Sequence, residues 1–413
     1  MANKIATIFL NYKKSLAEIA SDGLFYLIVL LIPFERAFKN EQVAFLQYFV
    51  VLFFCCSLFA AKKYYSRISC GIVFYVIFLF WGSISDIRTT GWLGFTSIWI
   101  MMRVWVVWFL MYASYNMSLL SLDKTKRLLT CLLCMAAMVA LMRIIGIGVD
   151  ESKVDRMEVM GANVNATARI LILMIIYTLL IISRGIRVSK IVTILGCALS
   201  LISIYALIKT GSRGGTLALA LAISGLVLTT KKISRKIIYL VLAGAALVGF
   251  ILVVISNEAL MERFFSAYYD DDTGGRKGFI EMSWEMLRHS KIFGYGCLAH
   301  TIELGHAFGI DVRATHNTYM YGLMAAGYPG AVFYYLALMV IAWKAWQIRT
   351  VPYGNFLFLV CFMMFFSGYV MNIEGTKWLY IVYGVTLGYA DRIYYAKRLN
   401  LPFDGVCSLE RMQ

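Results

Sequence analysis

Residues 189–256 read SKIVTILGCALSLISIYALIKTGSRGGTLALALAISGLVLTTKKISRKIIYLVLAGAALVGFILVVIS, which is three long apolar blocks separated by short polar gaps. Apolar blocks without regular polar alternation are typical of helices that cross a lipid bilayer, each of which needs about 20 residues. The same pattern recurs along the 413-residue chain, which is 61% hydrophobic and 15% charged. Soluble domains are about half apolar and about a quarter charged. We therefore predict an all-α integral membrane protein.

About twelve segments are candidate transmembrane helices, and together they predict one polytopic membrane domain over residues 1–413. Their expected bounds are 22–34, 43–60, 71–85, 93–115, 128–147, 166–183, 189–208, 214–230, 236–256, 317–345, 353–371 and 376–391.

The charged residues of the loops predict the orientation of these helices, because Lys and Arg accumulate on the cytoplasmic side. Acidic clusters at 150–158 and 270–272 fall in the loops between the basic ones. The basic residues occur in alternate loops and in the C-terminal tail: Lys62, Lys63, Arg67, Lys124, Lys126, Arg127, Arg184, Arg187, Lys190, Lys231, Lys232, Arg235, Lys236, Lys344, Arg349, Arg392, Lys397 and Arg398. Both termini are therefore expected in the cytoplasm. The net charge of +16 then reflects topology, so no nucleic-acid partner is expected.

One loop differs from the others in length. Residues 257–316 separate the ninth and tenth predicted helices on the outer side, and loops of this length are usually functional or disordered. Residues 278–289 within it have the apolar spacing of a helix. The four histidines of the chain all lie in this loop, but none of them has metal-ligand spacing. We predict neither a metal ion nor another cofactor.

Three arginines fall inside apolar segments, at Arg103, Arg143 and Arg169. A charge within the membrane is costly and marks a candidate functional site, although snorkelling to the headgroups or pairing with a carboxylate is the alternative.

Two glycine-containing turns on the outer side each carry an arginine at the start of a predicted helix. They are Lys209-Thr-Gly-Ser-Arg213-Gly-Gly and Thr273-Gly-Gly-Arg276. Free backbone N–H groups, the helix dipole and a guanidinium group together favour an anion such as phosphate. His316 stands beside Asn317 at the start of the tenth helix, where a histidine is either a capping residue or a general base.

These features resemble the O-antigen ligase and polymerase superfamily of bacterial membrane glycosyltransferases. An upstream Arg156 and Gly161-Ala-Asn163-Val-Asn165 also fit the pattern, so the resemblance spans about residues 150–335. The motifs that carry it occur in the order Gly-Ser-Arg213-Gly-Gly, Gly-Arg276, Phe-Gly-Tyr-Gly296, Thr-His316-Asn-Thr-Tyr319 and Gly327-Tyr-Pro-Gly330.

The resemblance implies a GT-C-like fold in the bacterial inner membrane, with the active site on the periplasmic face. It implies metal-independent, inverting transfer of a glycan from undecaprenyl pyrophosphate to lipid A–core or to another lipid-linked glycan. His316, Arg213 and Arg276 would be catalytic. Lower-ranked candidates for substrate binding are Arg103, Arg143, Arg169, Asn165, Asn317 and Tyr319.

Several functions remain open at this point: a ligase, a polymerase, a transporter or flippase, and a receptor or assembly scaffold. A ligase is slightly favoured over a polymerase by overall size and by the single large loop, although Thr315 stands where ligases often have proline. A transporter or flippase would share the helix count, but a transporter is expected to show internal repeat symmetry, and none is evident in the sequence.

Overall fold

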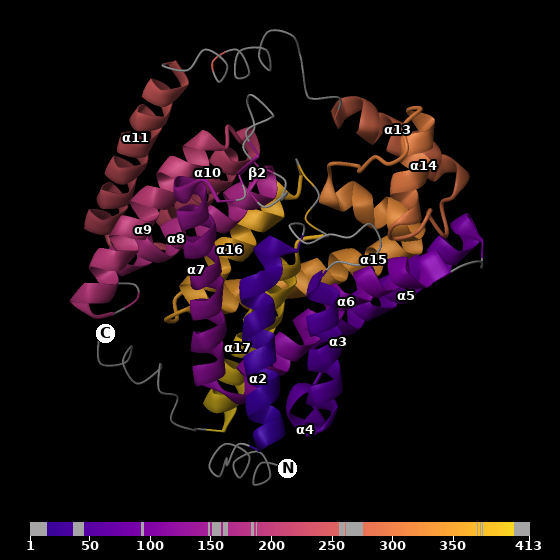
Figure 1. Cartoon of the computed structure of the whole chain (residues 1–413), viewed down its shortest axis with the longest axis horizontal. Coiled ribbons are helices and arrows are strands. Elements are labelled where there is room, and N and C mark those ends of the chain that lie inside the picture. The colour runs from indigo at the N-terminus through magenta and orange to yellow at the C-terminus, as the bar shows by residue number, and fades with distance from the viewer. Residues whose placement is uncertain are drawn as a thin grey trace.

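The computed structural model describes residues 15–35, 45–91, 95–147, 149–150, 158–159, 164–182, 186, 188–255, 261, 276–369, 371, 373 and 375–399. Within these ranges the chain is almost entirely helical, as predicted (Figure 1). The helices are α2 (Leu16–Leu31), η1 (Ile32–Phe34), α3 (Phe45–Leu58), α4 (Ala61–Tyr64), α5 (Cys70–Thr90), α6 (Phe95–Leu120), α7 (Leu122–Ile145), α8 (Val164–Ile182), α9 (Lys190–Lys209), α10 (Arg213–Thr229), α11 (Ile233–Ile255), α13 (Arg276–His289), α14 (Ala299–Ala307), α15 (Thr318–Ile348), α16 (Gly354–Ser367) and α17 (Lys377–Arg398). A two-residue antiparallel pairing joins β1 (Val149–Asp150) to β2 (Glu158–Val159).

Each of the twelve predicted spans overlaps one of these helices. Among the described residues, six helical segments are long and apolar enough to cross a membrane: Leu16–Phe34, Cys70–Thr90, Leu122–Ile145, Val164–Ile182, Lys190–Lys209 and Thr318–Ile348. Four more apolar helices are shorter: Leu46–Leu58, Val104–Leu120, Arg213–Thr229 and Gly354–Ser367. A membrane protein is thus supported, while the number of twelve spans and the cytoplasmic placement of both termini stay predictions.

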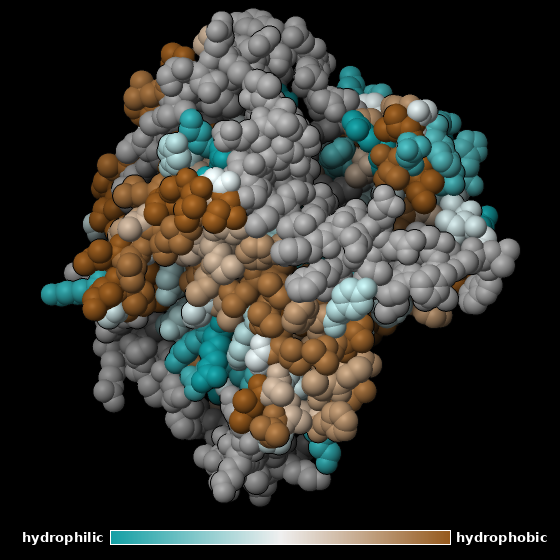
Figure 2. All heavy atoms as spheres, in the orientation of Figure 1, coloured by the Kyte–Doolittle hydropathy of each residue, from teal (hydrophilic) through white to brown (hydrophobic). Residues whose placement is uncertain are grey.

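The outer surface of the bundle has the polarity expected of a lipid-facing protein. On α9, Ile191, Ile194 and Leu201 are about seven-tenths exposed. Figure 2 shows hydrophobic residues over α9 and α10 at the left and hydrophilic residues over α13 and α14 at the upper right. In water, exposed apolar stripes of this kind would be a liability, whereas in a bilayer they face lipid tails of the same polarity.

Small residues allow the central helices to approach closely. A side chain at Gly384 of α17 would overlap the Met111 carbonyl oxygen of α6, and one at Gly388 would overlap the Tyr115 carbonyl oxygen. Close backbone contact at glycine is the usual way in which membrane helices gain van der Waals packing, since lipid provides no hydrophobic force between them. The α6–α17 pair therefore forms a tightly packed part of the core.

A buried charge cluster joins α2, α4 and α7 at one end of the bundle. Lys124 Nζ lies 2.9 Å from Glu18 Oε1 and 2.8 Å from Asp22 Oδ1, and Lys63 also pairs with Glu18. Tyr64 donates a hydrogen bond of 2.6 Å to Asp22. Lys63 and Lys124 both come from segments predicted to lie on the cytoplasmic side. Lys124 is nevertheless buried in the first turn of α7, so it is a structural residue and not a solvated loop charge.

The tenth predicted span, 317–345, is not one continuous helix. Gly327 has φ 60° and ψ −170° inside α15, and Pro329 follows it. Tyr335 donates a hydrogen bond of 2.7 Å to the Tyr319 carbonyl oxygen, although 16 residues of straight helix would separate them by about 24 Å. The chain therefore folds back at Gly327. We call residues 318–326 the arm of α15 and residues 328–348 its shaft.

Candidate functional site

The turn that carries Arg213 is held against the start of α8. Ser212 caps α10 by accepting a hydrogen bond of 2.9 Å from the Gly215 N–H, and its hydroxyl donates one of 2.6 Å to Asn165 Oδ1. A Cβ at Gly215 would lie 2.6 Å from the Ala168 Cβ, so only glycine permits this packing. The N-termini of α8 and α10 are thus side by side, with Arg213 as the first residue of α10.

Arg169 lies in the second turn of α8 and is only 5% exposed. Its Nε donates a hydrogen bond of 3.0 Å to the Asn165 carbonyl oxygen, one turn earlier. Arg169 therefore adds a guanidinium group to a place where two helix dipoles already present their positive ends, and Arg213 is the first residue of one of these two helices. Such an arrangement favours binding of an anion.

The start of α15 is fixed by a dense set of hydrogen bonds. Asn317 caps the helix by accepting bonds of 2.9 Å from the Tyr319 and Met320 N–H groups, and its amide donates one of 3.0 Å to the Tyr369 carbonyl oxygen. The Thr318 hydroxyl donates a bond of 3.0 Å to the Met371 carbonyl oxygen. Since these bonds engage both ends of its amide group, Asn317 is better suited to orient its neighbours than to bind substrate.

His316 precedes this cap and has a positive φ of 52°, which is uncommon for a residue with a side chain. Backbone strain of this kind persists only where the surroundings enforce it, and it clusters at functional sites. The His316 ring lies 5.8 Å, centroid to centroid, from the ring of Phe279, one turn after the start of α13 at Arg276. The structure therefore brings the beginning of α13 close to the beginning of α15.

Met371 contacts both the start of α10, which lies beside the start of α8, and the start of α15. A side chain at Gly214, next to Arg213, would overlap Met371 Cε, and the Met371 carbonyl oxygen accepts the bond from Thr318. The starts of α8, α10 and α15 thus meet around Gly368, Met371 and Ile373. The sequence-predicted residues Asn165, Arg169, Arg213, His316 and Asn317 belong to this assembly, which we call the helix-start cluster.

The other predicted site residues, Arg143, Tyr319, Arg103 and Arg276, are not among those that the structure places in the helix-start cluster. Arg143 is 8% exposed in the last turn of α7, and β2 contacts both α7 and α8. Tyr319 belongs to the arm of α15, and its hydroxyl donates a hydrogen bond of 2.7 Å to the Phe365 carbonyl oxygen. The side chains of Arg103 and Arg276 lie outside the described residues, although their backbones belong to α6 and α13.

Arg313 was missed by the sequence analysis. Its guanidinium carbon lies 4.2 Å from the centroid of the Phe279 ring, the same ring that contacts His316. Its backbone N–H donates a hydrogen bond of 2.7 Å to the Thr301 carbonyl oxygen, which ties this segment to α14. A fourth arginine in the outer loop was visible in the sequence, but nothing in its neighbours distinguished it.

Asp86 was also missed, and it anchors the outer segment to the membrane helices. Its carboxylate accepts three hydrogen bonds of 2.9–3.0 Å from the backbone N–H groups of Cys297, Leu298 and Ala299, at the start of α14. A side chain at Gly296 would overlap the carboxylate. A carboxylate at a helix N-terminus is a favourable charge-assisted cap.

Residues on either side of the break in α15 also form hydrogen bonds with the outer segment, at residues 291–296. The Tyr295 N–H donates a bond of 2.7 Å to the Met324 carbonyl oxygen, and the Tyr328 N–H donates one of 2.8 Å to the Lys291 carbonyl oxygen. Trp81 of α5 stacks on Phe293 with ring centroids 5.6 Å apart. The motifs Phe-Gly-Tyr-Gly296 and Gly327-Tyr-Pro-Gly330 therefore contact each other, and together with Asp86 they form what we call the loop clamp.

His300 lies in α14 and is 1% exposed. Burial lowers its pKa from 6.5 to about 4, although a hydrogen bond of 2.8 Å between Nδ1 and the Gly296 carbonyl oxygen opposes the shift. His300 is therefore neutral near pH 7. Among the described residues, no group of three or more His, Cys, Asp or Glu side chains is positioned to hold a metal ion.

Residues 198–335 match the family model described as O-antigen ligase. The match runs from α9 into the shaft of α15 and includes Arg213, Arg276, Arg313 and His316. It supports the O-antigen ligase superfamily, as the motifs had indicated. The search of curated proteins returned no match.

Proposed function

We propose that this chain, with its O-antigen ligase family region at residues 198–335, is a glycosyltransferase that uses a glycan linked to undecaprenyl pyrophosphate. The acceptor is a hydroxyl of lipid A–core, and the reaction takes place at the periplasmic face of the bacterial inner membrane. The observation that carries the proposal is the helix-start cluster, in which three helix N-termini, Arg169 and Arg213 adjoin the segment that bears His316.

The pyrophosphate is the leaving group in this reaction. Negative charge grows on its bridging oxygen as the bond to the sugar breaks, so groups that bind the charge more tightly in the transition state accelerate the step. Arg213 and Arg276 are proposed to contact the pyrophosphate, with Arg169 supporting the same charge from the start of α8. Cleavage of the sugar–pyrophosphate bond is itself favourable in free energy. The site residues therefore need only to position the two substrates and to stabilise the charge of the transition state.

The acceptor hydroxyl supplies the nucleophile. Its oxygen attacks the anomeric carbon from the face opposite the pyrophosphate, the bond from that carbon to the phosphate oxygen breaks, and the configuration inverts. The hydroxyl proton passes to His316, which acts as the general base. Asn317 caps α15 directly after His316, and we propose that this cap orients His316 for the transfer.

A polymerase would use the same site with a second lipid-linked glycan as acceptor. A deletion strain analysed by lipopolysaccharide gel separates the two activities. If the chain is a ligase, the deletion strain should contain lipid A–core without O-chain, and polymer should accumulate on the lipid carrier. This is the result we expect. Lipid A–core that carries a single repeat would instead identify a polymerase, and normal lipopolysaccharide would contradict both.

The reaction is proposed to need no metal ion. Purified protein incubated with lipid-linked donor and lipid A–core should transfer glycan equally well with and without a chelator. Inhibition by the chelator that a divalent cation reverses would contradict this part of the proposal.

A further inference from the structure

Arg313 lies shortly before His316, on the segment that joins α14 to α15. Its guanidinium carbon lies 4.2 Å from the centroid of the Phe279 ring, and Phe279 is only 5% exposed. Phe308 meets the same ring edge-on, with ring centroids 5.0 Å apart. A cation is attracted to the face of an aromatic ring, but this attraction uses none of its N–H groups. The contact with Phe279 therefore fixes the place of the guanidinium group and leaves its donors unused.

The side-chain N–H groups of Arg313 have no hydrogen-bond acceptor in the part of the chain that the structure describes. Nε is buried without a partner, and neither terminal nitrogen forms a hydrogen bond or an ion pair with a described residue. The terminal nitrogens are not buried in the same way, so a bound molecule can reach them. A guanidinium group presents five N–H donors, and burial of a donor without an acceptor is costly. Arg313 is therefore suited to a group that comes from outside the chain.

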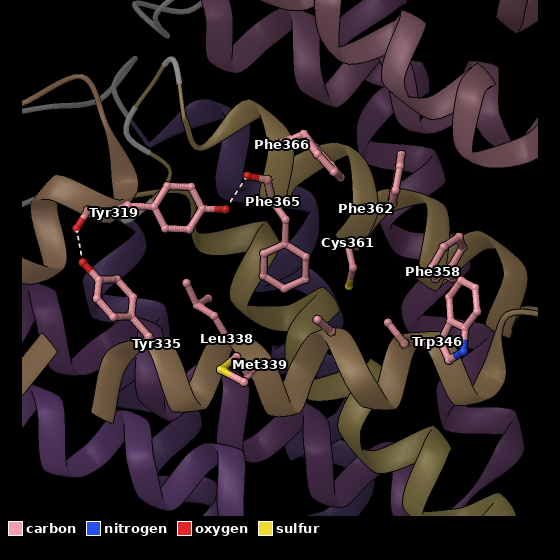
Figure 3. Close-up of a pocket in the computed structure, with 12 residues that line it drawn as sticks. Tyr319, Tyr335, Leu338, Met339, Trp346, Phe358, Cys361, Phe362, Phe365 and Phe366 are labelled. Atoms are coloured by element: carbon pink, nitrogen blue, oxygen red, sulfur yellow. Dashed lines mark hydrogen bonds between the residues drawn. The ribbon is translucent and has the colours of Figure 1, made fainter. Parts of the chain in front are cut away.

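The backbone that carries Arg313 and His316 is held at both ends. The Arg313 backbone N–H donates a bond of 2.7 Å to the Thr301 carbonyl oxygen of α14. After His316, the arm of α15 is fixed by Tyr319, whose hydroxyl donates a bond of 2.7 Å to the Phe365 carbonyl oxygen (Figure 3). The guanidinium group and the imidazole ring are therefore carried on one well-anchored segment.

One buried ring lies next to both side chains. The His316 ring lies 5.8 Å from the Phe279 ring, centroid to centroid, and the Arg313 guanidinium group lies against the same ring. The helix-start cluster reaches His316 by a different route, through the bond from Thr318 to the Met371 carbonyl oxygen. Arg313 is therefore a neighbour of the proposed general base that is positioned independently of the helix-start cluster.

An inverting transfer places the acceptor hydroxyl and the departing pyrophosphate on opposite faces of the anomeric carbon. The general base has to contact the acceptor hydroxyl, so a cation beside the base adjoins the acceptor glycan. The planar fork of an arginine matches the oxygens of a phosphate or a carboxylate.

We propose that Arg313 binds an anionic group, a phosphate or a carboxylate, of the acceptor glycan and thereby directs the acceptor hydroxyl to His316. The proposal rests on the proposed function, since it takes His316 as the base and a glycan as the acceptor. Arg313 is then a residue that determines acceptor specificity, whereas Arg213 serves the donor.

Substitutions at Arg313 test this role. Arg313→Gln removes the charge, whereas Arg313→Lys keeps the charge and loses the planar fork. Arg288→Gln is the matched control, because Arg288 is an exposed arginine of the same outer segment and pairs with Glu285 at 2.9 Å. All proteins are purified in nanodiscs, and KM is measured separately for the polyprenyl-pyrophosphate donor and for lipid A–core.

We expect Arg313→Gln to raise KM for lipid A–core by about 10- to 100-fold, which is the range for one hydrogen bond to a charged group. Arg313→Lys should raise it less. KM for the donor should stay at its wild-type value in both variants, and Arg288→Gln should change neither constant. An increase in KM for the donor alone would place the guanidinium group at the pyrophosphate and would overturn the proposal, as would wild-type constants in Arg313→Gln.

Modified acceptors separate binding by Arg313 from a packing role. One sample of lipid A–core has its phosphate groups removed, and another has its carboxylates converted to amides. The wild type should lose about 10- to 100-fold in kcat/KM on one of the two, and Arg313→Gln should lose nothing further on that acceptor, because both changes break the same contact. Losses that multiply on both acceptors would indicate a packing role and would refute the proposal.

Equilibrium binding of lipid A–core, measured without donor, distinguishes failure of this proposal from failure of the proposed function. If the wild type binds lipid A–core more tightly than Arg313→Gln but transfers no glycan to it, the role of Arg313 stands and the proposed function fails. If the wild type transfers glycan and the two proteins bind lipid A–core equally well, the proposed function stands and the role of Arg313 fails.

Discussion

Replacement of Asp86 by alanine should release the outer segment from the membrane helices. The carboxylate accepts three backbone N–H groups at the start of α14, and two of the three donor residues are buried. Hydrogen bonds to a charged group each contribute about 1.5–3 kcal/mol net. Allowing for non-additivity among neighbouring bonds, the substitution should weaken docking of this segment by about 3–6 kcal/mol.

Amide hydrogen exchange of the protein in nanodiscs measures this effect directly. Peptides that contain residues 297–299 should exchange much faster in Asp86→Ala than in the wild type, and Asp86→Asn should be intermediate because its amide retains one acceptor oxygen. Transfer should also fall by about 100-fold, since a displacement of about 1 Å of a catalytic group can have that effect. Asp123→Ala is the matched control, because Asp123 is an exposed aspartate at the start of α7. Unchanged protection of residues 297–299 in Asp86→Ala would refute the reasoning.

Three further perturbations test other parts of the structure. Ser212→Ala removes both the cap of α10 and the hydrogen bond to Asn165. The thermal unfolding midpoint should therefore fall, as expected for a loss of about 1–2 kcal/mol in the free energy of unfolding. Ser224→Ala, at an exposed serine of the same helix, is the control and should leave the midpoint unchanged. Because the pKa of His300 is depressed on folding, its contribution is complete above pH 6.5 and is lost as the pH falls toward 4. The difference in unfolding free energy between the wild type and His300→Asn should therefore shrink by about 3 kcal/mol as the pH is lowered from 6.5 to 4, and a difference that does not change with pH would contradict this. His316→Gly relieves the positive φ but deletes the base, so it should unfold no more easily than the wild type while losing transfer, and retained transfer would exclude a base role for His316.

Much of the fold follows from local sequence, because each apolar block forms its own helix in lipid. The helices at 190–209 and 213–229 were predicted to within a residue or two from their apolar blocks, and the structure shows in addition that Ser189 and Ser212 cap their starts. The reversal at Gly327 was not predicted, although its Gly-Tyr-Pro-Gly motif was noted. Hydropathy continues smoothly through the motif, and the break is stabilised by residues 291–296 of the outer loop, which local patterns do not reveal.

The candidate site was predictable to a similar extent. Arg169 drew attention because a charge in an apolar segment is costly, and Arg213 because of its glycine-rich turn. The contact of Ser212 with Asn165, 47 residues earlier, and the bonds of Asp86 to residues more than 200 positions later depend on tertiary packing. Asp86 stands just after the expected end of its span at residue 85, where an acidic residue is unremarkable in the sequence.

The central claim is that the helix-start cluster holds a lipid pyrophosphate for transfer. The most direct test is the initial rate of glycan transfer from polyprenyl-pyrophosphate donor to lipid A–core by purified Arg213→Ala, with Arg235→Ala, a predicted cytoplasmic arginine, as the matched control. We expect Arg213→Ala to lose at least about 100-fold in kcat/KM, as is typical when a group that stabilises transition-state charge is removed, and Arg235→Ala to match the wild type. Wild-type rates from Arg213→Ala would contradict the claim.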